Sequence, residues 1–345
     1  MAAKRRSAPK APAKKKRPNR GRKALLFLLL LGVLGGGAAA AFVMTRPAPE
    51  VAVAAALQKS AGGKGNGAGQ LESPRGLAVA PNGDVYVTDL GNSRISIFGP
   101  DGGFKRSFGK QGPEPGKAKL GEFNEPSGVA VGPDGTVYVA DAWNGRIQRF
   151  SAKGEALPDY NGSRYSFYSP RNVAVDRLGN LYVADTGNSL VKVIGPDGKI
   201  IKALGGKGEG DGQFNEVFGI AVNAQGEIFV ADPGNRKIHK FSAMPAGDHV
   251  VSRKVPGWLL NAPFWPQLAC DREGLIYAMD PAGRKIWVYD SQLEYRATVG
   301  APHGIDFLAS PMGLAFDNNG TLWVSDNAGN RIMNLARLEI PAARP

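Results

Sequence analysis

The sequence predicts an all-β protein, a six-bladed β-propeller preceded by one transmembrane helix and a disordered basic tail. Residues 126–150 (PSGVAVGPDGTVYVADAWNGRIQRF) show the unit on which the propeller prediction rests: two short apolar runs and a third alternating run, separated by turn residues. This is the pattern of three antiparallel strands. Similar units recur along the chain, and an isolated sheet of this size needs neighbours to bury its faces.

Six copies of the unit follow one another. They begin at Pro74, Pro126, Pro170, Val217, Trp265 and Pro311. An aspartate closes the second predicted strand of each copy, at Asp89, Asp141, Asp185, Asp232, Asp280 and Asp326, with a period of 44 to 52 residues. That period is typical of propeller blades, and six blades are enough to close a ring.

A short motif recurs inside the copies: Gly-[Val/Ile/Leu]-Ala-Val, then Val-Tyr-Val-Ala-Asp, then x-x-Asn-x-Arg. Its last part stands as Asp89/Asn92/Arg94 and Asp141/Asn144/Arg146, and is kept partly at Asn188, Asn235 and Arg331. The pattern resembles the NHL-repeat family of six-bladed β-propellers. Later copies depart from it, because Leu190 replaces the arginine, Gly283 replaces the asparagine, and Asn330 is displaced by one position.

The recurring polar residues are expected to be structural, because every blade needs them. An aspartate at a strand end can accept backbone N–H groups of the following turn, and the arginine can pair with it or with the next blade. Residues that differ between the copies are therefore better candidates for function.

The N-terminal part predicts a membrane anchor. Residues 1–23 contain eleven Lys or Arg and no acid, which indicates a disordered tail, and residues 24–44 are uncharged and long enough to cross a bilayer. The positive flank predicts a bacterial inner-membrane protein with its N-terminus inside and its propeller periplasmic or extracellular. Residues 45–52 form a short linker, and the propeller spans 53–340. A cleaved signal peptide, with small residues at 38–41, is the alternative.

The charge of the body argues against nucleic acid as a partner. The chain carries 43 basic and 30 acidic residues, but without the eleven basic residues of the tail the balance is 32 to 30. A near-neutral exported body does not attract a polyanion by net charge. The single cysteine, Cys270, excludes an internal disulfide and is interpreted as a small buried apolar residue.

One alignment predicts how the ring closes. GGKGNGAGQL from Gly62 matches GGKGEGDGQF from Gly205 at seven of ten positions, and the second copy follows a fourth strand. Residues 53–60 are then also a fourth strand, which must complete the last blade and remove its open edge. Residues 336–340 are the alternative for this strand.

Two insertions and one turn carry candidate ligand-binding residues. Residues 155–168 contain Tyr160, Arg164 and Tyr165, residues 244–265 contain Trp258 and Trp265, and the turn after Asp141 carries Trp143. Loops from fourth to first strand and from second to third strand emerge on the same face of a propeller, so these side chains can gather there. The alternative is that they cover exposed blade edges.

The residue near the start of each first strand should lie close to the mouth of the central channel. These residues are Arg75, Ser127, Arg171, Phe218, Pro266 and Met312. Arg75 and Arg171 form a candidate site for a carboxylate or phosphate, unless each pairs only with a nearby aspartate.

The sequence contains no signature of catalysis. The family resemblance extends to zinc-dependent amidating lyases, which require several His ligands, but the three histidines His239, His249 and His303 do not reproduce one ligand set. No catalytic residue, metal or cofactor is therefore predicted. The predicted function is a membrane-anchored scaffold that recognises a protein, peptide or glycan through its loop-rich face. The alternatives are a metal-dependent lyase or hydrolase at the channel mouth, and an extracytoplasmic sensor with a separate signalling partner.

Overall fold

A computed structural model describes residues 51–259, 265–300 and 302–342. The predicted tail (1–23), anchor (24–44) and most of the linker (45–52) lie outside these described residues. No helix in the described ranges is both long enough and apolar enough to cross a membrane.

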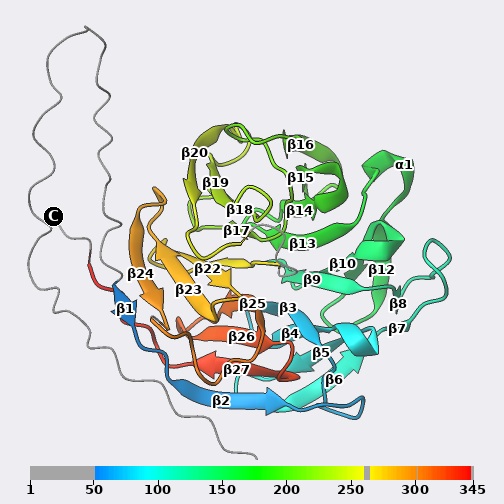
Figure 1. The fold of residues 1–345 in the computed structure, drawn as a ribbon. Helices are drawn as coiled ribbons and strands as arrows, with labels where there is room; N and C mark the ends of the chain where they lie inside the picture. Colours follow the sequence, from blue (N-terminus) through cyan, green and yellow to red (C-terminus); the bar gives the residue numbers. More distant parts are fainter. Residues whose placement is uncertain (1–50, 260–264, 301, 343–345) are drawn as a thin grey trace, which may run out of the picture. The chain divides into compact units, whose positions relative to one another are not determined.

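The described residues form six sheets around a common axis, which confirms the six-bladed propeller (Figure 1). Blade one comprises β3 (Pro74–Val79), β4 (Val85–Asp89), β5 (Arg94–Phe98) and β6 (Phe104–Phe108). Blade two comprises β9 (Pro126–Val131), β10 (Val137–Asp141), β11 (Arg146–Phe150) and β12 (Ala156–Tyr160). Blade three comprises β13 (Pro170–Val175), β14 (Leu181–Asp185), β15 (Leu190–Ile194) and β16 (Ile200–Gly205).

The second half of the ring has the same plan. Blade four comprises β17 (Ile220–Val222), β18 (Ile228–Asp232), β19 (Lys237–Phe241) and β20 (His249–Lys254). Blade five comprises β21 (Leu268–Cys270), β22 (Ile276–Asp280), β23 (Lys285–Tyr289) and β24 (Tyr295–Val299). Blade six comprises β25 (Pro311–Phe316), β26 (Leu322–Asp326) and β27 (Arg331–Leu335), and its fourth strand comes from the N-terminal side.

That fourth strand is β2 (Leu57–Gly62), which pairs antiparallel with β27. The predicted closure by an N-terminal strand is confirmed, although the strand lies a few residues later than 53–60. The alternative strand, residues 336–340, is not a strand. An unpredicted element, β1 (Ala52–Val53), adds to blade five by pairing parallel with β24. The N-terminal segment therefore fastens two blades.

Short elements occupy the connections between strands. One-turn 3-10 helices, η1 (Leu90–Asn92), η2 (Ala142–Asn144) and η3 (Thr186–Asn188), link the second and third strands of the first three blades. The connection from blade one to blade two contains the parallel pair β7 (Lys110–Gln111) and β8 (Glu122–Phe123). The first insertion contains α1 (Gly162–Tyr165).

The core lies between blades. Every residue of the second strands β4, β10, β14, β18, β22 and β26 is buried, and the apolar side chains form clusters that span neighbouring blades. Close to the axis the inner strands touch one another. Thr88 Oγ1 donates to the carbonyl oxygen of Ser127 at 2.9 Å, and Ser325 Oγ donates to the carbonyl oxygen of Arg75 at 2.5 Å. These bonds tie blade one to blades two and six.

The repeat aspartates are buried at the ends of the second strands, where each accepts backbone N–H groups. In blade two, Asp141 accepts from Asn124 N at 2.8 Å, and also from the side chains of Asn144 and Arg146. The expected donors are in the following turn, but in five of the six blades at least one backbone donor lies in the segment before the first strand, and blade four adds Asn235 N of its own turn at 3.3 Å. Asp280 differs, since it accepts from Gly283 N in its own turn at 3.0 Å. The aspartate thus fixes the entry of the chain into its blade.

Candidate ligand site at the axis of the ring

Side chains from five blades meet at the end of the axis where the inner strands begin. We call Arg75, Glu125, Arg171, Phe218 and Trp265 the axial cluster. Arg75 Nη1 and Arg171 Nη1 both donate to Glu125 Oε1, at 2.9 and 2.5 Å. The guanidinium carbons lie 3.8 and 5.4 Å from the ring centroid of Trp265, whose other neighbour is the stacked ring of Phe218 at 5.5 Å. The predicted pair of arginines is therefore brought together.

Topology explains why these residues meet. Arg75 and Arg171 are the second residues of β3 and β13, Phe218 and Trp265 precede β17 and β21, and Glu125 precedes β9. All five stand where a fourth-to-first connection enters an inner strand, and the inner strands of neighbouring blades contact one another around the axis. Two arginines on the same sheet position of different blades therefore point at one place.

The axial cluster contains polar atoms without partners. Arg75 Nε and Glu125 Oε2 are buried and have no hydrogen-bond partner among the described residues. Burial lowers the pKa of the Arg75 guanidinium from its ordinary value, and the bond and charge of Glu125 oppose this shift. Two guanidinium groups thus share one carboxylate oxygen, while one oxygen and one N–H of the cluster are buried without a hydrogen bond.

A second carboxyl lies near Arg171. Glu216 is an exposed residue, but desolvation of its carboxyl and the charge of Asp232 raise its pKa, and Arg171 opposes the shift. A carboxyl with a raised pKa carries less negative charge at a given pH, so Glu216 neutralises the arginines less than an ordinary glutamate would.

Below the axial cluster a polar bridge crosses the axis. The Asn172 side-chain amide donates to Gln267 Oε1, and both residues are buried, at 5% and 7% exposure. The bridge joins blade three to blade five.

Four predicted ligand-binding residues do not line this site. Tyr160, Tyr165 and Trp258 are buried at 6%, 6% and 4% exposure and belong to the core. Tyr165 OH and Arg164 Nη2 both donate to the carbonyl oxygen of Gly198, at 2.8 and 3.1 Å. The three buried aromatics instead pack in the core, as the alternative interpretation of the insertions predicts.

Other apolar side chains remain exposed on the loop-rich face. Trp143, the predicted ligand-binding residue in η2, is 61% exposed. Tyr168 and Leu259, at 67% and 61% exposure, also lie in loops of this face. These side chains leave apolar surface exposed on the loop-rich face.

Glu125 was missed by sequence reasoning. It precedes Pro126 where the copies at Pro74 and Pro170 have Ser73 and Ser169, and all three residues have positive φ, between 52° and 60°. The glutamate at a position where two other copies have serine was the one sequence feature that could have indicated a role for Glu125. The sequence did not indicate that two arginines, 50 and 46 residues away, would converge on it.

The histidines do not fit a metal site at the axis. His239 is fully buried in β19, where its Nδ1 bonds Ser252 Oγ at 2.9 Å, and His249 Nε2 bonds the same hydroxyl at 2.8 Å. His303 lines a separate groove beside residues 53–55. Within the described ranges, no group of three or more His, Cys, Asp or Glu side chains converges as a ligand set.

A comparison with known protein families identifies three of the repeats. A profile of the NHL repeat matches residues 71–98, 123–150 and 167–194, within the first three blades. The chain is 36% identical over 97 residues to a probable peptidyl-alpha-hydroxyglycine alpha-amidating lyase of Caenorhabditis elegans, a match that covers 28% of this chain and 27% of that protein. A Drosophila melanogaster peptidyl-alpha-hydroxyglycine alpha-amidating lyase is 36% identical over 87 residues, 24% of this chain and 16% of that protein. The chain thus spans well under a third of either relative.

Solved structures share the fold over most of the chain. Virginiamycin B lyase from Staphylococcus aureus superposes with a TM-score of 0.55 at 17% identity, covering 76% of this chain and 94% of that one. A gluconolactonase from Xanthomonas campestris gives a TM-score of 0.58 at 18% identity, covering 86% and 100%. At these identities the likeness concerns the fold.

Proposed function

The chain is an NHL-repeat six-bladed β-propeller, and on that premise we propose that it is a recognition scaffold for a protein, peptide or glycan. The ligand binds across the loop-rich face and places an acidic group beside Arg75 and Arg171. The observation that carries the proposal is the convergence of both guanidinium groups on Glu125 Oε1, over the ring of Trp265. Guanidinium pairs are suited to carboxylates and phosphates because they donate several charge-assisted bonds in a fixed geometry.

The scaffold is proposed to be anchored in a bacterial inner membrane by residues 24–44, with the N-terminus inside and the propeller periplasmic or extracellular. The support is the uncharged span directly behind eleven basic residues in 1–23. An extracytoplasmic sensor that passes its signal to a separate partner has the same anatomy, and the identity of the captured partner distinguishes it from a plain scaffold.

The test is capture of partners by the purified full chain from extracts of the source cells, with quantitative mass spectrometry. We expect Arg171→Gln and Trp143→Ala each to lower capture of the specific partner by about tenfold or more, the usual cost of an interface anchor. Leu178→Ala is the matched control, because Leu178 is 78% exposed but lies in a first-to-second strand turn on the opposite face. Equal capture by all variants would remove this face as the site.

A second candidate function is a lyase or hydrolase. It is favoured by the two amidating lyases that share 36% identity with parts of the chain. The described residues do not form a zinc ligand set, so we derive no reaction step here. Elemental analysis of the purified full chain separates the candidates: a stoichiometric metal ion, lost together with substrate turnover on chelation, would favour the enzyme over the scaffold.

A further inference from the structure

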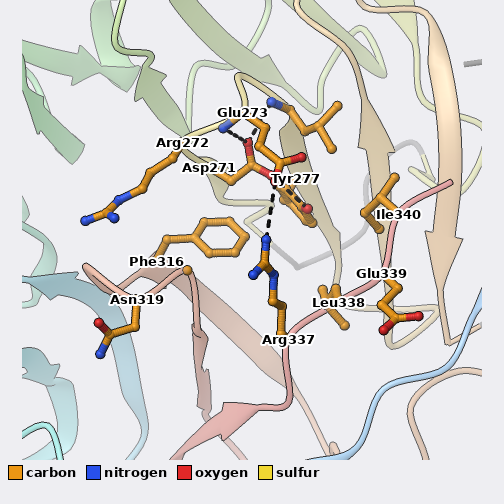
Figure 2. A pocket seen from close by; sticks show the side chains of 12 residues that line it. Asp271, Arg272, Glu273, Tyr277, Phe316, Asn319, Arg337, Leu338, Glu339 and Ile340 are labelled. Atoms are coloured by element: carbon orange, nitrogen blue, oxygen red, sulfur yellow. Dashed lines mark hydrogen bonds and ion pairs between the residues drawn. The ribbon is translucent and has the colours of Figure 1, made fainter. Parts of the chain in front are cut away.

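A cavity of about 560 Å³ lies between blades five and six, away from the axial cluster (Figure 2). It is lined by the turn 271–275 of blade five, by Tyr277 and Phe316, and by the turn 319–320 of blade six. Both turns connect first to second strands, so the cavity opens on the face opposite the axial cluster. Its fourth side is residues 337–340, part of the segment 336–342 that we call the C-terminal strap.

The C-terminal strap lies in this groove as an extended peptide ligand would. Its exposure alternates, with Ala336, Leu338 and Ile340 partly buried and the residues between them exposed. Leu338 and Ile340 pack against the core cluster of blades five and six. An extended chain places alternate side chains on opposite sides, which is how a groove with side-chain pockets reads a peptide.

Few polar contacts hold the strap. Ala336 N donates to the carbonyl oxygen of Ala56 at 2.7 Å, and Arg296 Nη2 donates to that of Pro341 at 2.7 Å. The Arg337–Glu273 ion pair is 3.5 Å long, with the two side chains 78% and 71% exposed. Exposed pairs of this kind contribute little to stability. The strap is not part of a sheet, because β2 occupies the fourth-strand position of blade six.

The strap also fills its groove incompletely. The cavity remains beside Leu338 and Ile340, whereas protein interiors are normally close-packed, and its volume is in the range of ligand pockets. The floor is firm, since Tyr277 and Phe316 pack edge to face at 4.7 Å, and Asp271 accepts from Glu273 N, Leu275 N and Tyr277 OH at 2.9, 2.9 and 3.1 Å. A bulkier peptide therefore finds a preformed surface.

We propose that this groove is a peptide-binding site that the chain's own C-terminal strap occupies in the absence of a partner. The partner is an extended segment of another protein with bulky apolar residues two positions apart, to fill the space that Leu338 and Ile340 leave. A basic residue of the segment replaces Arg337 opposite the carboxylate of Glu273. This site is separate from the proposed function, which uses the opposite face.

The test measures fluorescence anisotropy of labelled peptides with the sequence of residues 336–342. We expect the peptide carrying Leu338→Phe to bind the full chain more tightly than the unchanged peptide. The Ile340→Ser chain, whose strap is weakened, should bind the Leu338→Phe peptide about tenfold more tightly than the wild-type chain. Arg171→Gln is the control for the other face and should leave this binding unchanged.

A charge exchange keeps the test decisive if Ile340→Ser perturbs folding. Glu273 lies at the surface, so Glu273→Arg leaves the core intact. This chain should bind the peptide about two- to threefold more weakly, the effect expected of an exposed ion pair, and a peptide with Arg337→Glu should restore the binding. Absence of binding to every folded variant, or loss without restoration by the exchanged peptide, would overturn the proposal. Loss of partner capture at the axial cluster has no bearing on either result.

Discussion

At the scale of single residues, the six buried aspartates are alike but their partners differ. Arg94 and Arg146 lie at 2.8 and 2.9 Å from Asp89 and Asp141. Blade three has Leu190 at that position, and Lys192 lies 2.7 Å from Asp185 instead. The position of Lys192 carries a donor in other blades too, such as Gln148, which bonds Asp141 at 2.9 Å. Removing one partner of a buried pair is costly because the other charge stays desolvated.

The aspartates of blades two and five should therefore respond differently to loss of charge. Asp141→Asn removes the charged partner of the buried Arg146 Nε and leaves Asp159, 3.2 Å from Nη1, as the other ion-pair partner of this arginine. We expect it to lower the free energy of unfolding by about 2 to 3 kcal/mol at pH 7. Burial raises the pKa of Asp280. The backbone N–H of Gly283, the side-chain hydrogen bond from Trp287 and the charge of Lys285 oppose this shift. Asp280→Asn should then cost less than about 1 kcal/mol.

The pH dependence has a definite sign. Because the folded pKa of Asp280 is raised, its contribution to stability is present at low pH and is lost as pH rises through the folded pKa. Relative to the wild-type chain, Asp280→Asn should gain in urea unfolding midpoint between pH 4 and pH 7. A relative loss over that interval would contradict the assignment. Glu209→Gln, at an exposed loop position, is the control for a charge change.

At the scale of the blade, the sequence predicted what every copy repeats. The strands and the positions of the aspartates followed from the alternation of Val-Tyr-Val and from a 44 to 52 residue period. It did not predict which insertion aromatics are buried, because Tyr160, Tyr165 and Trp258 have no counterpart in the other copies. Glu125 was not predicted as a site residue for a related reason, since its contacts with Arg75 and Arg171 join residues far apart in the sequence.

Blade three can be converted to the pattern of blade two. Lys192→Met removes the cation from the buried Asp185, and we expect a loss of about 3 to 5 kcal/mol in unfolding free energy. Adding Leu190→Arg should recover most of it, because Leu190 faces Asp185 in the same register as Arg146 faces Asp141. Urea denaturation of the single and double variants measures the coupling. If the double variant is no more stable than Lys192→Met, the two positions are not interchangeable.

At the scale of the whole molecule, one alignment predicted the closure of the ring. The Gly62 and Gly205 runs placed a strand before blade one, and β2 pairs with β27. β1 was not predicted, because a two-residue strand such as Ala52–Val53 is too short to show alternation.

The predicted anchor can be tested on intact cells. If residues 24–44 span the inner membrane, a protease added after permeabilising the outer membrane should digest the propeller and spare a tag fused before residue 1. A propeller that survives until the inner membrane is lysed would place it in the cytoplasm. A tag missing from the mature protein would instead indicate cleavage of a signal peptide.

The N-terminal segment supplies strands to blades five and six, and this determines when these two blades can be completed during synthesis. β1 and β2 leave the ribosome before any blade, yet their partners are residues 298–299 and 331–335. Contacts so distant along the chain form slowly, and here they cannot form before residues 298–299 and 331–335 have been made. We expect the nascent chain to carry two unpaired strands and an unfinished sixth blade until β27 has been synthesised.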